Sequence, residues 1–160
     1  MIQCAKRMFY QYLVEKRGFS MAETPVEPGI EPRGTMVLRT CAMPADTNPS
    51  GDIFGGWLLS QMDIASGMLA EWRADGRVAT ISVQEMVFHR PVRVGDVVCC
   101  YAEIVRTGTT SIAVNVEAWV LRRRDQTRRV KVTEGVFTFV AIDADGVKRP
   151  LPPLDSIPHA

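Results

Sequence analysis

One acidic residue stands inside a long apolar stretch of this sequence and is the first candidate for chemistry. Asp63 lies within residues 53–73, where apolar side chains fall on nearly every side of a helical wheel. Such a pattern predicts a buried helix rather than a surface one. Because an ionised carboxylate in a buried helix is costly unless it is paired or used, Asp63 is a candidate general base or carboxylate nucleophile.

A glycine pair opens the same predicted helix. Gly55 and Gly56 fall in its first turn, where backbone N–H groups lack intrahelical partners and the helix dipole is positive. A start without side chains lets an oxygen atom approach these donors, as an oxyanion hole for acyl transfer requires. The alternative is a flexible or crowded helix start with no chemical role.

The helix face that carries Asp63 is made of small and polar residues. Gly56, Ser60, Asp63 and Gly67 follow at spacings of four, three and four, which places them on one side. A glycine within a helix costs about 1 kcal/mol relative to alanine, so this face indicates close approach by a ligand or by another backbone. Ser60 is therefore a candidate substrate-binding residue. Tight packing, with Asp63 bonded to a neighbouring backbone, is the alternative.

The elements around the helix predict an α+β fold. Alternation and turn residues predict one strand before the helix and four after it, at residues 35–43, 77–89, 97–107, 111–124 and 128–143. Consecutive strands with short connections are antiparallel. The prediction is a five-stranded antiparallel sheet wrapped around one long central helix.

The strand after the helix carries further candidates. Thr80 and Ser82 are its hydroxyl residues and are taken as possible substrate contacts. The apolar parity of this strand slips near Gln84–Glu85, which predicts a β-bulge there.

Length and net charge limit the classes of protein to which the chain can belong. The 160 residues fit one domain, and a formal net charge of +1 gives no general footprint for nucleic acid or an anionic membrane. Residues 1–34 are basic and then rich in proline and glycine, which predicts an N-terminal extension and linker. We expect the folded domain at 35–153 and a tail at 154–160.

The cysteines argue against a metal site. No CxxC spacing occurs among Cys4, Cys41, Cys99 and Cys100, so zinc is not expected. Small buried thiols are typical of a reducing compartment, and we expect a cytoplasmic protein. Cys99 and Cys100 are neighbours in a predicted strand and should point to opposite faces.

Three further features each have two interpretations. Asn48 either forms a local Asx-turn before Pro49 or serves the site. His89, the one histidine suited to acid–base work, is interpreted as a satisfied strand-end residue, since no GxSxG motif accompanies it. The basic segment 121–131 is either a solvated hairpin end or a docking site for ligand phosphates.

Three segments together resemble a known family. MPADTNPSGDIFGGWLLSQMDIASG (43–67), RPVRVGDVVCCYAEI (90–104) and the GTTS turn (108–111) are similar to the YciA-type acyl-CoA thioesterases of the hot-dog fold. The resemblance covers residues 35–152, and the combination DTN…GDIFGGW…QMD is specific.

The resemblance implies an activity, an assembly and several roles. The reaction would be hydrolysis of an acyl-CoA thioester to a free acid and CoA, with no metal or other cofactor. Two chains would pair edge to edge and share active sites, and three dimers would often form a hexamer. Asp63 matches the catalytic acid, Asn48 the asparagine that works with the acid of the partner subunit, and Gly55 and Gly56 the pair that polarises the thioester carbonyl.

The resemblance leaves the CoA contacts and one alternative function open. Arg90, Gly108, Thr109, Arg122 and Arg123 are the candidate CoA-binding residues. A hot-dog hydratase would need a histidine on or beside the central helix, and none is present. A non-catalytic acyl-CoA-binding module would bind the thioester without releasing thiol.

Overall fold

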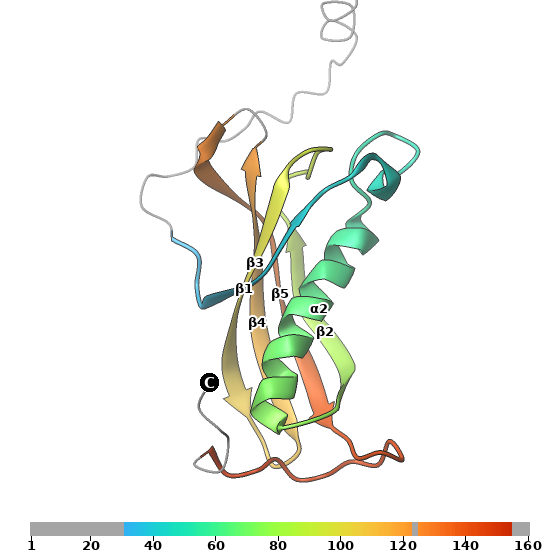
Figure 1. The fold of residues 1–160 in the computed structure, drawn as a ribbon, viewed down its shortest axis with the longest axis vertical. Coiled ribbons are helices and arrows are strands. Elements are labelled where there is room, and N and C mark those ends of the chain that lie inside the picture. The colour runs from blue at the N-terminus through green and yellow to red at the C-terminus, as the bar shows by residue number, and fades with distance from the viewer. Residues whose placement is uncertain (1–30, 123–124, 155–160) are drawn as a thin grey trace, which may run out of the picture. The chain divides into compact units, whose positions relative to one another are not determined.

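The computed structural model describes residues 31–122 and 125–154 (Figure 1). The elements follow in chain order as β1 (Thr35–Cys41), a short 3-10 helix η1 (Pro44–Asp46), helix α2 (Gly55–Ala74), β2 (Val78–Phe88), β3 (Val97–Thr107), β4 (Ser111–Arg122) and β5 (Asp125–Ala141). The compact unit to which they belong begins at Glu31.

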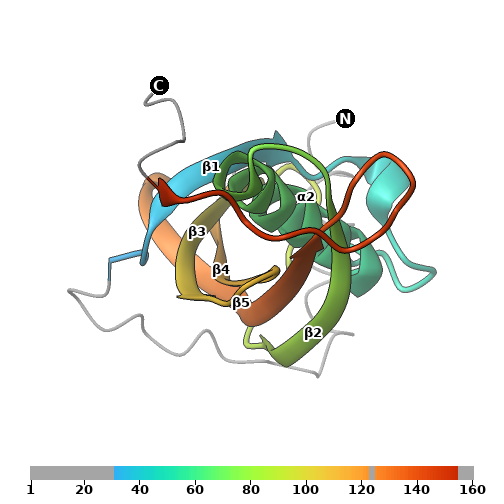
Figure 2. The same cartoon turned by 90° about the horizontal axis from the view of Figure 1, so that it is seen from below.

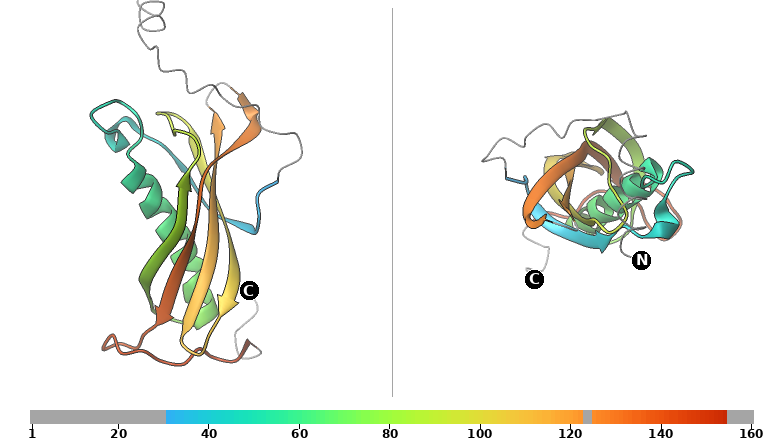
Figure 3. Two further views of the ribbon diagram at one scale, coloured as in Figure 1. Left: turned by 180° about the vertical axis from the view of Figure 1, so that it is seen from behind. Right: turned by 90° about the horizontal axis from the view of Figure 1, so that it is seen from above.

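The five strands form one antiparallel sheet in the order β1-β3-β4-β5-β2. The sheet curls around α2, as the end-on view shows (Figure 2). Seen from behind, β2 and β5 lie side by side, and β4 follows β5 (Figure 3). The predicted fold class is therefore confirmed. The strands β1 and β2 are the two edges of the sheet within the described chain.

The alternation of side chains along β4 divides the sheet into an inner and an outer face. Its inner side chains pack in the main core under α2, namely Ile112, Val114, Val116, Ala118 and Val120. Cys100 belongs to this core, whereas Cys99 packs with Tyr101 and Trp119 on the outer face. The prediction that the two neighbouring cysteines point to opposite faces is confirmed.

Helix α2 is buried on one side only, which corrects the expectation of a helix buried all round. Met62, Ala65 and Ala70 are fully buried against the sheet. In the single chain, Ile64 and Met68 are 49% and 52% exposed. The wheel was apolar on nearly every side because a second apolar face exists, and residues 31–122 and 125–154 leave that face exposed.

The two ends of α2 are closed differently. Its N-cap is Phe54, which makes no side-chain hydrogen bond to the helix. At the C-terminus Asp75 adopts a left-handed conformation, and the Arg149 guanidinium donates to the carbonyl oxygens of Ala74 (2.8 Å) and Asp75 (3.2 Å). A cation that binds the last carbonyls also complements the helix dipole.

The boundaries differ from the predicted ones where turns were involved. The hairpin turn expected at residues 125–127 belongs to β5, which begins at Asp125. The first strand ends at Cys41 because Pro44 begins η1. The predicted bulge is confirmed, because the β2–β5 register shifts between Gln84 and Val87, and Glu85 has a φ of 55°.

Candidate active site

Asp63 is held by a hydroxyl group from the neighbouring strand. Two turns into α2, it is half-buried, and its Oδ1 accepts a hydrogen bond of 2.8 Å from Thr80 Oγ1. Thr80 pairs with Phe139, whose side chain is in the core, so Thr80 lies on the inner face toward the helix. The structure thus joins two of the predicted site residues, which lie 17 positions apart in the sequence.

The other predicted hydroxyls do not contact Asp63. Ser82 pairs with Thr138, and Thr138 pairs with Ala113, at outer-face positions of the sheet. Ser60 donates to the carbonyl oxygen of Trp57 at 2.7 Å. Residues two apart in a regular strand share a face, but the β2–β5 register shifts between Thr80 and Ser82, and this irregularity puts them on opposite faces. The hydroxyl of Ser60 is used by its own helix backbone.

The loop before α2 is organised by Asn48. Its side-chain oxygen accepts the backbone N–H groups of Ser50 (2.9 Å) and Asp52 (3.2 Å), while its own N–H donates to the carbonyl of Asp52 at 2.8 Å. The local Asx-type interpretation is therefore confirmed. The same contacts fix the orientation of the carboxamide, and within the described chain no hydrogen bond joins Asn48 to Asp63.

Gly55 and Gly56 begin the helix with unpaired amides. The carbonyl of Phe54 accepts the N–H groups of Trp57 (3.0 Å) and Leu58 (3.3 Å), and the described residues supply no backbone acceptor for the two glycine N–H groups. A β-carbon on Gly56 would collide with the ring of Phe54, and one on Gly55 would lie 3.6 Å from Phe88 Cε1. Packing therefore accounts for glycine at position 56 but not at position 55, where a β-carbon would make an ordinary contact.

The candidate CoA-binding residues lie at two places. Arg90 donates to the carbonyl of Lys131 at 3.1 Å, and Arg122 forms an ion pair with the buried Asp96. Gly108 and Thr109 lie in the β3–β4 turn at the opposite end of α2 from Gly55 (Figure 1). Arg122 is thus a structural ion-pair partner in this chain, and Arg123 lies outside the described residues.

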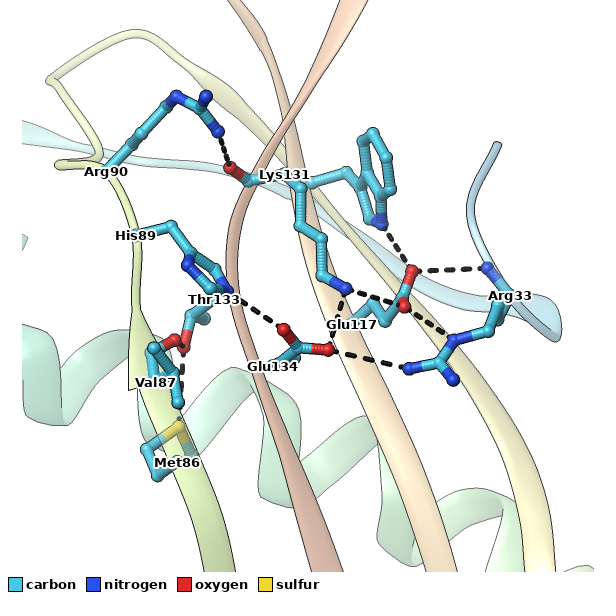
Figure 4. Close-up of polar contacts among 10 residues, drawn as sticks. Arg33, Met86, Val87, His89, Arg90, Glu117, Lys131, Thr133 and Glu134 are labelled. Atoms are coloured by element: carbon cyan, nitrogen blue, oxygen red, sulfur yellow. Dashed lines mark hydrogen bonds and ion pairs between the residues drawn. The ribbon is translucent and has the colours of Figure 1, made fainter. Parts of the chain in front are cut away.

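A cluster of charges on the outer face was not foreseen from the sequence (Figure 4). The Glu117 side chain is 2% exposed, and it accepts hydrogen bonds from Lys131 Nζ (2.8 Å), Trp119 Nε1 (2.9 Å) and Arg33 Nε (2.9 Å). Lys131 Nζ also donates to Glu134 Oε2 at 2.7 Å. The other oxygen of Glu134, Oε1, lies 2.9 Å from His89 Nε2. The interpretation of His89 as a satisfied strand-end residue is confirmed.

This cluster shifts the pKa values of its two acids. Burial is the largest single influence on Glu117 and opposes ionisation. The bonds from Lys131, Trp119 and Arg33 together outweigh it and lower the pKa to about 2. The bond from Lys131 is the largest cause that lowers the pKa of Glu134. Both carboxylates are therefore structural anions, remote from Asp63 on the other face of the sheet.

Among the described residues, no helix is long and apolar enough to cross a membrane. The same part of the chain contains no group of three or more His, Cys, Asp or Glu side chains that could hold a metal ion.

Comparison with known proteins identifies the family. Residues 50–126 match the Thioesterase superfamily. The chain is 58% identical over 123 residues to the acyl-CoA thioester hydrolase YciA of Salmonella typhimurium, covering 76% of this chain and 92% of that one. The chain therefore belongs to the thioesterase superfamily and has the hot-dog fold.

Solved structures agree with this assignment. The hexameric thioesterase y2039 of Yersinia pestis is 54% identical, with a TM-score of 0.74 over 77% of this chain and 99% of that one. HI0827, described as a hexameric broad-specificity acyl-coenzyme A thioesterase, has a TM-score of 0.76 at 46% identity, over 81% of this chain and 88% of that one.

Proposed function

We propose that this protein is an acyl-CoA thioesterase whose base is Asp63. It hydrolyses the thioester to a carboxylic acid and free CoA. The observation that carries the proposal is the Thr80–Asp63 hydrogen bond of 2.8 Å, which positions one half-buried carboxylate on the inner face of the sheet. The close similarity to YciA hydrolases supports the reaction class.

The chemistry follows from the groups at hand. Asp63 removes a proton from water, the resulting hydroxide attacks the thioester carbon, and the carbonyl oxygen becomes an oxyanion. The free N–H groups of Gly55 and Gly56 bind that oxyanion at the positive end of the helix dipole. The C–S bond then breaks, and the CoA thiolate leaves and takes up a proton. No cofactor takes part in these steps.

The site is shared between two chains. Asp63 follows Gly55 by eight residues, about 12 Å along a helix that rises 1.5 Å per residue. A base, its water, the attacked carbonyl group and an amide donor span at most about 10 Å, given ~3 Å for each hydrogen bond and ~3 Å from the water to the carbonyl carbon. This difference favours a site in which the acid and the glycine pair on one thioester come from different copies.

The free edge of β2 is the surface that joins the copies. Antiparallel pairing of two β2 edges brings the Thr80 end of one strand beside the Phe88 end of the other. Thr80 binds Asp63, and the ring of Phe88 lies close to the β-carbon position of Gly55. The pairing therefore sets Asp63 of one chain beside the glycine pair and Asn48 loop of the partner subunit. Three such dimers would give a hexamer, the assembly that the solved relatives have.

Replacement of the proposed base tests the mechanism. Asp63→Asn keeps the size of the side chain and is expected to lower kcat by at least about 10³-fold, since the water loses its base and no neighbouring carboxylate replaces it. Thiol release from a panel of acyl-CoAs measures the effect, and the oligomeric state is compared with that of the parent chain. Undiminished hydrolysis by a folded Asp63→Asn oligomer would refute the assignment.

The same assay separates the alternative function. A non-catalytic acyl-CoA-binding module would bind the intact thioester without releasing thiol, whatever residue stands at position 63. A nucleophilic role for Asp63 is distinguished by a single turnover in ¹⁸O-labelled water. Label in Asp63 would show that Asp63 attacks the substrate, because water must then have opened an acyl–Asp63 anhydride at the aspartyl carbon, whereas a base leaves Asp63 unlabelled.

The compartment that we propose is the cytoplasm. Cys41, Cys99 and Cys100 are free cysteines in the described chain, and the last two are buried. Burial raises the pKa of the Cys100 thiol to about 12, which keeps it protonated and inert.

A further inference from the structure

Two aromatic rings converge on the glycine pair. Phe54 and Phe88 are 58% and 54% exposed in the single chain, although both are large and apolar. The ring of Phe54 occupies the space that a side chain on Gly56 would fill, and the ring of Phe88 lies 3.6 Å from where a β-carbon of Gly55 would be. The two rings therefore lie beside the glycine pair, and they come from different elements.

Each ring is fixed by a well-anchored backbone. Phe54 donates its N–H to the carbonyl of Asp46 at 2.9 Å, and its own carbonyl accepts the first bonds of α2. Phe88 ends β2 opposite Thr133, and Thr133 Oγ1 donates to the carbonyl of the preceding Val87 at 2.6 Å. These contacts place the rings without using any polar group of the proposed site.

We infer that Phe54 and Phe88 are positioning residues that keep water away from the Gly55 and Gly56 amides in the thioesterase site. A hydrogen bond to a developing oxyanion is stronger where water and its high dielectric constant are excluded. The rings contain no hydrogen-bond acceptor that would compete for the amides. Gly56 must be glycine because a β-carbon would displace the ring that covers it. The inference rests on the proposed function of this site.

The kinetic test separates water exclusion from substrate binding. Phe54→Ala and Phe88→Ala are each expected to lower kcat about tenfold, less than the 10²–10³-fold typical of losing an oxyanion donor. KM should change little, and the loss should be similar for short and long acyl chains. Phe54→Leu and Phe88→Leu should recover most of kcat, since a branched apolar side chain still excludes water. Val147→Ala, which shortens another exposed apolar side chain, is the matched control and should leave kcat unchanged.

A second measurement does not depend on turnover. Hydrogen exchange of a peptide spanning residues 53–58, at millisecond to second labelling times, reports solvent access to the two amides. Faster exchange in Phe54→Ala than in Phe54→Leu or Val147→Ala supports the inference, even if the parent chain proves to bind acyl-CoA without hydrolysing it. Equal exchange in all variants overturns it. A loss that appears in KM and grows with acyl chain length also overturns it, because the rings would then be walls of the acyl pocket.

Discussion

The hydrogen bond from Thr80 couples the proposed base to the sheet. Asp63 alone would follow the motions of an exposed helix face, whereas a donor 2.8 Å away on β2 restricts its rotamer. The contact also uses Oδ1 and leaves Oδ2 for water. A single hydroxyl therefore sets both the position of the carboxylate and the oxygen that does chemistry.

Removing that hydroxyl should impair the chemical step. Thr80→Val keeps the shape of the side chain and is expected to lower kcat about tenfold, since hydrogen bonds to charged groups contribute about 1.5–3 kcal/mol when buried and less when solvated. Thr80→Ser retains the donor and should keep most of the activity. Steady-state thiol release measures both variants. Equal rates in Thr80→Val and the parent chain would show that the contact has no catalytic role.

The outer face of the sheet is stabilised by a buried acid. Glu117 on β4 binds Lys131 on β5 and Arg33 in the segment before β1, so three parts of the chain meet at one carboxylate. Breaking a buried ion pair by removing one partner is strongly destabilising. This cluster belongs to the stability of the sheet and not to the chemistry on its inner face.

The sign of the Glu117 shift predicts how stability depends on pH. Its folded pKa of about 2 lies below its ordinary value of 4.5. Its contribution, up to about 3 kcal/mol, is therefore complete above pH 4.5 and is lost as the pH falls toward 2. Urea unfolding at fixed protein concentration across this range measures the decline.

A neutral replacement provides the control for this pH dependence. Glu117→Gln should lower stability at neutral pH and make the acid decline shallower, because the titrating group is gone. Glu103→Gln, on the adjacent strand, should keep the decline of the parent chain. If stability fell equally with pH in the parent chain and in Glu117→Gln, the acid decline would not be due to Glu117.

Elements with strong periodicity were predictable, and those fixed by distant contacts were not. The strand β3 and the bulge at Gln84–Glu85 follow from local alternation, and the structure has both. The exact start of α2 at Gly55 could not be predicted from the local sequence, because its N-cap is an apolar residue without a capping side chain. Local capping residues such as Asp52 precede the helix, but the loop uses their backbone groups.

In the candidate site, too, residues that stand out in the local sequence were predictable, and contacts between distant residues were not. Asp63 was identified because an acid is conspicuous in an apolar run, and Thr80 because it lies on the strand that follows. The ion pair between Arg122 and Asp96 joins residues 26 positions apart and leaves no local pattern. Ser82 was assigned with Thr80 because residues two apart in a strand share a face, but a register shift between them places Ser82 on the outer face.

At the scale of the whole molecule, the described part of the single chain leaves large apolar side chains exposed. An apolar face of α2 and the apolar edge of β2 are both exposed, with Ile81 57% accessible. An exposed, apolar strand edge is a site where another chain can pair. Together these surfaces favour an obligate dimer over a stable monomer.

A charge at that edge should separate the copies. Ile81→Lys is expected to shift the protein toward smaller species and to remove most of the thioesterase activity, because the proposed site is built from two chains. Val147→Lys, at a similarly exposed apolar position in the turn after β5, should leave both unchanged. Analytical ultracentrifugation and thiol release are measured on the same samples. An active Ile81→Lys monomer would disprove the shared site.

The distance between Asp63 and Gly55 within one helix has a genetic consequence. With the proposed shared site, a chain with a defective acid and a chain with a defective glycine pair would each form inactive homodimers. Mixed together, they form dimers in which one site carries both defects and the other site carries neither. Two alleles that are each null would thus complement each other inside a single cell. In a cell with one null and one wild-type allele, each mixed dimer would keep one active site and lose the other.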